Sequence, residues 1–280
     1  MNSKIVGQYY FDPDLLTVEL NTLLSLPYVA GYSDFIFGRW ETCVLYNGSG
    51  NHTDDVLSEY IGAAKPTVLM RDLSYVPLIL AQLVDMRYLK WLRVFVFHSG
   101  VILPHRDYLE LNKGYTRLHI PLQTDLGALH SEDQHVFHMR LGDVWHLDAR
   151  SVHSACNISK APRVSLCLDF DPEIPLSQLL KIPQDLDGTR YQAHVVARKA
   201  FSERDKELLL ARHADTTPET FRQLLADLAM IHFQNDVSAD AMFTWLGQMA
   251  TEWKSEKLTA MVKDVERFAV LMRPSVAVKY

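Results

Sequence analysis

A histidine and an aspartate separated by one residue are the side chains in this sequence whose spacing best suits a metal ion. His105 and Asp107 follow an apolar run that begins at Gly100. If this segment is extended, both side chains point to the same side, because side chains alternate along a strand. His153 lies later in the chain and is our candidate for a third ligand. Two histidines and one carboxylate on one face, with the other metal positions open, are typical of non-haem Fe(II) oxygenases.

Two groups of side chains that could bind carboxylates accompany this predicted metal site. Arg163 and Ser165 alternate on one predicted strand, and an arginine beside a hydroxyl can hold a carboxylate through several hydrogen bonds. Arg117 and His119 share another strand face and offer a second anion site. This combination favours an oxygenase that uses 2-oxoglutarate, with one end of the keto acid on iron and the other on Arg163. The same ligands also suit zinc, so a zinc site remains an alternative.

Histidines are concentrated around the predicted ligands. Eight of the twelve lie between His98 and His153. No carboxylate stands beside His130, His135 or His138 in the way that Asp107 stands beside its histidine. We therefore expect His135 and His138 at the surface or behind the ligands, without a direct contact to the metal.

The composition argues against several classes of protein. The 280-residue chain is 48% hydrophobic, enough for a sizeable core, and its net charge of -6 disfavours nucleic acid or an anionic membrane as a partner. The three cysteines form no Cys-x-x-Cys pair, which fits a reducing compartment. There is no signal-peptide apolar region and no apolar run long enough to span a membrane. We therefore expect a cytoplasmic protein.

The first two thirds of the chain are predicted to form mainly short strands. Asp12 and Pro13 mark the start of a helix, and a second helix is expected over residues 77–84. Two short extended pieces are expected within residues 32–46, and a turn at 98–100 is expected just before the segment with His105. Other strand-like runs, separated by turn signals, are residues 5–11, 91–97, 117–123, 135–140, 143–148 and 163–170. Strands at near-regular spacing favour an antiparallel barrel or jelly roll.

Beyond Pro172 the strong patterns become helical. Helix starts are predicted after Ser202, at Thr217 and at Ser238, and an amphipathic stripe runs from Leu258 to Met272. We therefore expect a mainly β fold with α: a double-stranded β-helix (jelly roll, cupin-like) core with a small C-terminal α-helical domain. The expected domains are residues 1–182 and 183–280. The helical part could cover the mouth of the barrel or form a homodimer contact.

Several longer segments together resemble one family of enzymes. The sequence is similar to the bacterial free-L-proline cis-hydroxylases, which belong to the aspartyl/asparaginyl β-hydroxylase group of 2-oxoglutarate oxygenases. The resemblance covers most of residues 1–170, and the helical part resembles their C-terminal domain around residues 228–233. The segments that carry it are 32–35, 38–41, 102–111, 137–139, 142–145, 147–149 and 153–155.

The resemblance implies a reaction and a set of roles. Free L-proline is hydroxylated with O2 and 2-oxoglutarate, which leaves as succinate and CO2. His105, Asp107 and His153 are implied to bind Fe(II). The cosubstrate is implied to contact Arg163 and Ser165 at its distal carboxylate, with His119 nearby, and the substrate pocket is implied to include Arg117 for the amino-acid carboxylate, with Arg93, Tyr108 and Trp40.

The position of hydroxylation is left open by the sequence. Residues 32–41 and 108–111 resemble the cis-4 enzymes, whereas residues 45–47 and Val152 resemble the cis-3 enzyme. His146 stands where the family has an aromatic residue after Trp145. The alternatives are the same chemistry on another free amino acid, such as pipecolate or an aliphatic amino acid, and a non-catalytic cupin-like binding protein.

Overall fold

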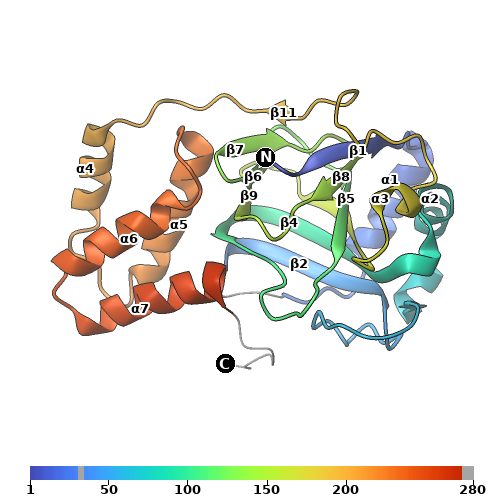
Figure 1. Ribbon diagram of the computed structural model, residues 1–280, viewed down its shortest axis with the longest axis horizontal. Helices are drawn as coiled ribbons and strands as arrows, with labels where there is room; N and C mark the ends of the chain where they lie inside the picture. Colours follow the sequence, from blue (N-terminus) through green and yellow to red (C-terminus); the bar gives the residue numbers. More distant parts are fainter. Residues whose placement is uncertain (31–34, 273–280) are drawn as a thin grey trace.

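The strands of the protein form one curled antiparallel sheet (Figure 1). The computed structural model describes residues 1–30 and 35–272. Hydrogen-bonded neighbours follow the order β1-β8-β5-β10-β4-β9-β6-β7-β11, while β2 pairs with β3 and β4. The strands are β1 (Lys4–Gln8), β2 (Ile36–Asn47), β3 (Lys65–Pro66), β4 (Leu89–His105), β5 (Thr116–Gln123), β6 (Ala128–Glu132), β7 (His135–His138), β8 (Asp143–Leu147), β9 (His153–Asn157), β10 (Arg163–Phe170) and β11 (His194–Val195). The predicted jelly-roll core is confirmed.

The central strand β4 differs from its prediction. The turn expected at residues 98–100 is wrong, because β4 runs without a break to His105. Gly100 has a φ of 110° and is paired with Gly38, whose φ is 126°. A Cβ atom on Gly100 would lie 1.8 Å from the carbonyl oxygen of Phe37. The two glycines therefore let β2 and β4 approach and bend while they stay paired, and the glycine that suggested a turn lies within one long strand.

Two other strands were also predicted incorrectly. Residues 36–47 form one strand instead of two short pieces, because two register shifts against β4 interrupt the ladder without ending it. Residues 32–34 of that expectation lie outside the described part of the chain. β6 was missed because Ser131 and Glu132 make it look like a polar loop, although both side chains are buried between β7 and β9.

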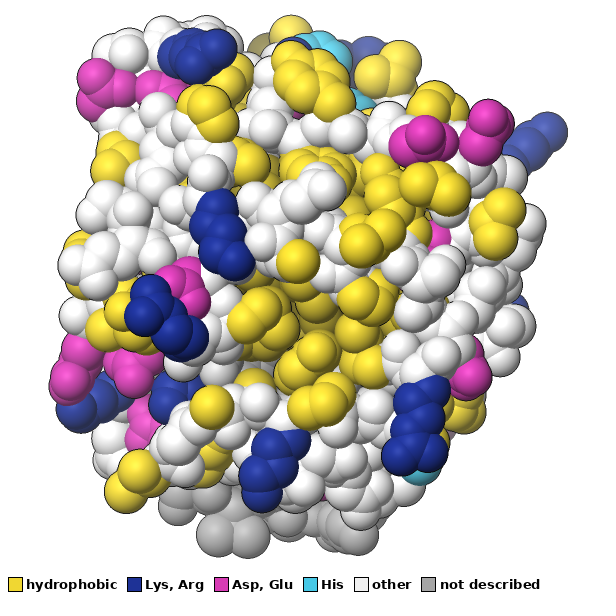
Figure 2. All heavy atoms as spheres, turned by 90° about the vertical axis from the view of Figure 1, so that its right-hand side faces the viewer, with side chains coloured by type: hydrophobic (Ala, Val, Ile, Leu, Met, Phe, Trp, Pro, Cys, Tyr) yellow, Lys and Arg dark blue, Asp and Glu magenta, His cyan; other side chains and the backbone are white. Residues whose placement is uncertain are grey.

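A group of short helices covers one end of the sheet (Figure 1). They are α1 (Pro13–Leu24), α2 (Tyr75–Leu83), α3 (Leu176–Leu179) and the 3-10 helices η1 (Val68–Asp72) and η2 (Met86–Tyr88). Asp12 caps α1 as predicted, accepting from the backbone N–H groups of residues 14 and 15. Leu23 and Ile79 are fully buried in the core beside Val94 of β4. The outer face at this end carries a group of exposed apolar side chains (Figure 2), and Val18 of α1 and Leu78 of α2 are more than half exposed.

The C-terminal helices lie at the opposite end of the sheet (Figure 1). They are α4 (Glu203–Arg212), α5 (Phe221–Gln234), α6 (Ala241–Glu252), α7 (Glu256–Glu266) and the π-helix η3 (Arg267–Leu271). Ser202 and Asp205 form the capping box at the start of α4. Leu224 and Leu228 of α5 share one hydrophobic core with Val101 of β4, so these helices pack directly on the barrel. No helix within residues 1–30 and 35–272 combines the length and apolarity of a membrane span.

Candidate active site

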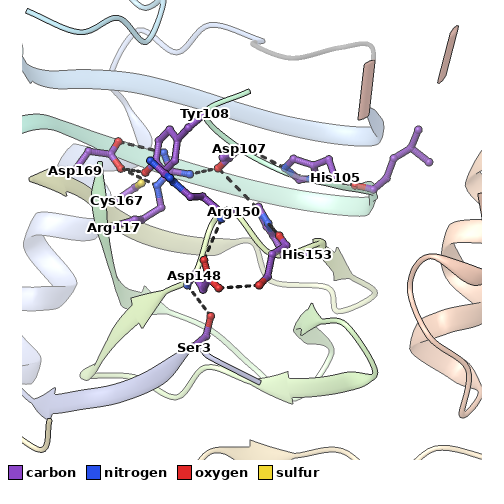
Figure 3. A network of polar contacts seen from close by, with 12 residues as sticks. Ser3, His105, Asp107, Tyr108, Arg117, Asp148, Arg150, His153, Cys167 and Asp169 are labelled. Atoms are coloured by element: carbon purple, nitrogen blue, oxygen red, sulfur yellow. Dashed lines mark hydrogen bonds and ion pairs between the residues drawn. The ribbon is translucent and has the colours of Figure 1, made fainter. Parts of the chain in front are cut away.

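The three predicted metal ligands meet where β4 ends and β9 begins. His105, the last residue of β4, is paired with His153, the first residue of β9. Asp107 lies in a bend just after β4 and not on the strand itself. Its backbone N–H donates to the Ala149 carbonyl at 2.7 Å, and this hydrogen bond holds the residue in place. One ligand atom from each residue lies within 4.8 Å of the other two (Figure 3). This arrangement suits a single metal ion.

Each ligand histidine is oriented by a backbone carbonyl. Nδ1 of His105 lies 2.7 Å from the Leu103 oxygen, and Nδ1 of His153 lies 3.0 Å from the Ser151 oxygen. Because a carbonyl oxygen only accepts hydrogen bonds, each Nδ1 carries the proton, and in the neutral imidazole the lone pair is then on Nε2. The Nε2 atoms lie 3.6 and 3.7 Å from the carboxylate oxygens of Asp107. Both imidazoles are thus held in the form that binds a divalent metal.

The ligand atoms line a cavity of about 790 Å³, a volume that includes its opening to solvent. Its wall combines apolar side chains with a basic group, and its carboxylates are Asp107 and Glu110. The apolar part is Phe35, Ile36, Trp40, Leu57, Phe95, Ile102, Leu147 and Ala155. The basic part is Arg93, Arg117, Arg163, His119 and His130, next to the ligand histidines. Such a wall suits a small anionic ligand with an apolar portion.

Arg163 and Ser165 provide an anion site on β10. Nη1 of Arg163 and Oγ of Ser165 are buried and have no hydrogen-bond partner among the described residues. Burial lowers the pKa of Arg163 to about 10. A buried guanidinium needs an anion to offset its lost hydration, so these two groups fit a carboxylate of a bound ligand. Nδ1 of His119 is also buried without a partner in the described structure.

Arg117, in contrast, already contacts two carboxylates. Its Nε and Nη2 donate to the two oxygens of Asp169 at 2.7 and 3.2 Å, and its Nη1 donates to Oδ2 of Asp107 (Figure 3). Nη2 of Arg93 donates to the same Asp169 carboxylate at 2.9 Å. Burial, followed by the nearby charge of Arg117, holds the pKa of His119 well below its usual value, which keeps that imidazole neutral.

Most of the predicted pocket residues reach the cavity wall. Trp40, Arg93 and Arg117 line it, whereas Tyr108 does not belong to its lining within the described residues. The Tyr108 hydroxyl donates instead to Oδ1 of Asp169 at 2.7 Å. Ser165 is fully buried and, although not part of the lining, lies on the same face of β10 as Arg163 by strand alternation.

Sequence reasoning missed three side chains of this site. His130 stacks on His153 with 5.8 Å between ring centroids, but its contribution needs β6, which was not predicted. Glu110 lines the cavity although no partner pattern marked it. Asp169 could have been found by extending the alternation from Arg163, since residues 163, 165, 167 and 169 lie on one face of β10.

Comparison with known proteins agrees with this geometry. The family model described as aspartyl/asparaginyl β-hydroxylase matches residues 29–172, and the model described as L-proline 3-hydroxylase, C-terminal, matches residues 177–276. The L-proline cis-4-hydroxylase of Rhizobium meliloti (strain 1021) is 32% identical over 96% of this chain and 95% of that protein. The L-proline cis-3-hydroxylases 1 and 2 of Streptomyces sp are 31% and 30% identical, over 96% and 98% of this chain and 95% and 96% of those proteins.

A solved oxidoreductase of the 2OG-Fe(II) oxygenase family from Burkholderia pseudomallei is 13% identical, with a TM-score of 0.41 over 58% of this chain and 80% of that chain. That likeness is weak, and the fold assignment rests on the strand pairing described above. The family model and the relatives, which match nearly all of the chain, identify the family. The chain belongs to the aspartyl/asparaginyl β-hydroxylase family.

Proposed function

We propose that this protein is an Fe(II)- and 2-oxoglutarate-dependent dioxygenase that hydroxylates free L-proline at the cis-4 or cis-3 position. One observation carries the proposal: a single cavity contains both the ligand triad and the buried Arg163. The triad offers three donors on one side of an ion, and the arginine requires an anion. A keto acid that chelates the metal and reaches a buried cation satisfies both. The resemblance to L-proline hydroxylases over 96% of the chain supports proline as the substrate.

The proposed roles follow from the contacts of each side chain. His105, Asp107 and His153 hold Fe(II), and Arg163 with Ser165 holds the distal carboxylate of 2-oxoglutarate, with His119 beside it. Bound Fe(II) supplies O2 activation: one oxygen atom enters succinate as 2-oxoglutarate loses CO2, and the other becomes the hydroxyl on the substrate carbon. The chain orients both substrates and keeps water away from them.

The substrate side of the cavity is proposed to bind a zwitterion through separate polar and apolar contacts. Arg117 uses three of its five N–H groups on Asp169 and Asp107, which leaves two for the carboxylate of the amino acid. Arg93 also lies in the wall, and Trp40 offers an apolar surface for the ring. A direct contact between Tyr108 and the amino acid stays a prediction.

The test is a succinate-release assay with Fe(II), 2-oxoglutarate, O2 and a panel of free amino acids that includes L-proline, pipecolate and aliphatic amino acids. We expect the largest stimulation by L-proline, and NMR of the product identifies the carbon and the face. If another amino acid stimulates succinate release more than L-proline does, that amino acid would be assigned as the substrate in place of L-proline. Absence of any stimulated turnover, with iron bound at one equivalent, would favour a non-catalytic cupin-like protein. Asp107→Ala is the control and should lose turnover.

The remaining features of the proposal concern location and organisation. The three cysteines are free, which supports the cytoplasm as the location. We propose residues 1–182 as the oxygenase domain and 183–280 as the helical domain, because α4 to α7 all follow residue 183. Homodimerisation stays a prediction, which sedimentation of the full chain would test.

A further inference from the structure

A buried carboxylate lies directly behind the cavity. Asp169, on β10, is fully buried and accepts hydrogen bonds from Arg93, Arg117 and Tyr108 (Figure 3). Burial alone would raise the pKa of Asp169, but the charges of Arg117 and Arg93 lower it below its usual value. The side chain is therefore a carboxylate that two guanidiniums and one hydroxyl share.

The sheet register explains why these groups meet. β10 lies between β4 and β5, with Asp169 paired to Arg117 on β5 and Cys167 paired to Arg93 on β4. Side chains two residues apart share a face of a strand, so the Asp169 carboxylate lies among side chains that point to the same interior. The two ion pairs are thus built by three strands, and only the Tyr108 contact comes from the segment between β4 and β5.

Asp169 also separates the three cavity arginines into two kinds. Arg93 and Arg117 form ion pairs with it at 2.9 and 2.7 Å. Arg163, on the same strand as Asp169, has a buried Nη1 without a hydrogen-bond partner among the described residues. A buried cation binds an anion most strongly when it has no internal partner. We therefore expect the carboxylate of the cosubstrate to bind Arg163 and not Arg93 or Arg117.

Two routes connect Asp169 to the metal ligand Asp107. In the first route, Asp169 accepts hydrogen bonds from Nε and Nη2 of Arg117, and Nη1 of the same arginine donates to Oδ2 of Asp107. Through the second, it accepts from the hydroxyl of Tyr108, the residue next to Asp107. Tyr108 has a φ of 62°, a left-handed conformation that is unfavourable for a side chain of this size. The hydroxyl contact helps to hold the backbone in that conformation.

We propose that Asp169 is the positioning residue of this active site, which fixes the side chain of Asp107 through Arg117 and its backbone through Tyr108. It also fixes the plane of Arg117, so that the two remaining N–H groups are presented to the amino-acid carboxylate. The part that concerns the amino acid rests on the proposed function. The part that concerns Asp107 rests only on the proposed metal site.

The experiment compares Asp169→Asn with Asp143→Asn in the full chain. Asp143 is a matched control, since it is 1% exposed and paired with Arg140 at 2.9 Å, but its side-chain partners Arg140 and Gln8 do not line the cavity. Co(II) serves as the metal probe, and its binding is followed by titration and by its visible absorption spectrum. We expect Asp169→Asn to bind Co(II) about 10- to 100-fold more weakly, the usual effect of removing a group that supports a metal ligand. Asp143→Asn should bind as the wild type does.

Two further measurements complete the test. In the assay with L-proline, Asp169→Asn should raise the KM for the amino acid more than it lowers kcat, and should raise the ratio of succinate to hydroxylated product. Tyr108→Phe keeps the ring and removes only the hydroxyl, so it should weaken Co(II) binding in the same direction by a smaller factor. If Asp169→Asn does not fold, the Co(II) affinity of Tyr108→Phe tests the positioning role.

Wild-type Co(II) affinity in a folded Asp169→Asn, or in Tyr108→Phe when the first variant is unfolded, would overturn the inference. This result is distinct from failure of the proposed function. If no amino acid stimulates turnover but Asp169→Asn still loses Co(II) affinity, the positioning role stands and the substrate assignment falls.

Discussion

The ring of Phe35 stacks on the imidazole of His105, with 5.3 Å between the centroids and 29° between the planes. The same ring stacks on Phe268 of η3 at 4.7 Å. The backbone N–H of Arg106 donates to the carbonyl of Ala269 at 2.9 Å. The C-terminal helices thus contact the end of the strand that carries His105, the first proposed metal ligand.

Phe268→Ala should therefore affect the metal site as well as stability. Loss of the aromatic pair alone should reduce the free energy of unfolding by about 0.5 to 1.5 kcal/mol. Because Phe35 then loses its support, Co(II) affinity should fall by roughly threefold to tenfold, within the range seen when groups behind a ligand are removed. Phe201→Ala is the control, since the Phe201 ring contacts Trp245 in a tilted arrangement and neither ring lines the cavity. Equal Co(II) affinities in the two variants would show that the stack contributes only stability.

Arg163→Gln should weaken 2-oxoglutarate binding by about 10- to 100-fold, because a charged hydrogen bond contributes roughly 1.5 to 3 kcal/mol. The apparent Kd for 2-oxoglutarate, measured anaerobically with metal bound, is the quantity to compare. The unliganded variant should be at least as stable as the wild type, since it no longer buries an uncompensated cation. Arg87→Gln removes a surface arginine paired with Asp85 and should leave 2-oxoglutarate binding unchanged. An unaltered Kd in Arg163→Gln would remove the arginine from the cosubstrate site.

Gly100→Ala should reduce the free energy of unfolding by about 2 to 4 kcal/mol. The new methyl group would overlap the Phe37 carbonyl oxygen, and the positive φ disfavours any residue with a Cβ. Gly247→Ala provides a contrast of opposite sign, because a Cβ there meets nothing within 4 Å and the residue lies inside α6. That variant should gain about 0.5 to 1 kcal/mol. Urea unfolding of both variants measures the difference, and similar stabilities would show that β2 and β4 can separate at this point.

His232 should make the protein less stable as the pH falls below neutrality. Burial lowers the pKa of His232 to about 4, whereas an unfolded histidine has a pKa of about 6.5. Between these values the unfolded chain binds a proton that the folded chain does not, so stability is complete above pH 6.5 and declines towards pH 4. The loss amounts to roughly 3 kcal/mol. His232→Asn can retain a donor for the Val237 carbonyl without titrating, so its urea midpoint should change less over this range. An identical pH dependence would assign the effect to other groups.

The proposed metal ligands could be selected from the sequence by their residue types and, for His105 and Asp107, by their short spacing. The structure brings all three together, and their binding of a metal stays a prediction. Arg163 and Ser165 followed from alternation on one strand. Asp169 lies four residues beyond Ser165 on the same face, but an aspartate in an apolar strand looks like an edge or a turn unless its arginine partners are known. Those partners belong to β4 and β5, and no local pattern gives the register of strands so far apart in the chain.

The long strand was misread for a related reason. A glycine after two polar residues, at 98–100, predicts a turn when only one strand is considered. Gly38, more than sixty residues earlier, is what makes the bend compatible with pairing. His130 was likewise left without a role because β6 is polar in sequence and buried only through β7 and β9. Contacts between distant segments, and not local propensity, decided each of these features.

β4 pairs with β2, which precedes it, and with β9 and β10, which follow it. During synthesis, His105 therefore leaves the ribosome well before the strand that contains His153 can pair with it. The metal is not expected to act as an early template for the fold, since the third proposed ligand and the strand with Arg163 are made after β4 to β8. Iron loading is consequently expected late in maturation, and a chain interrupted before β9 would lack His153, the third proposed ligand.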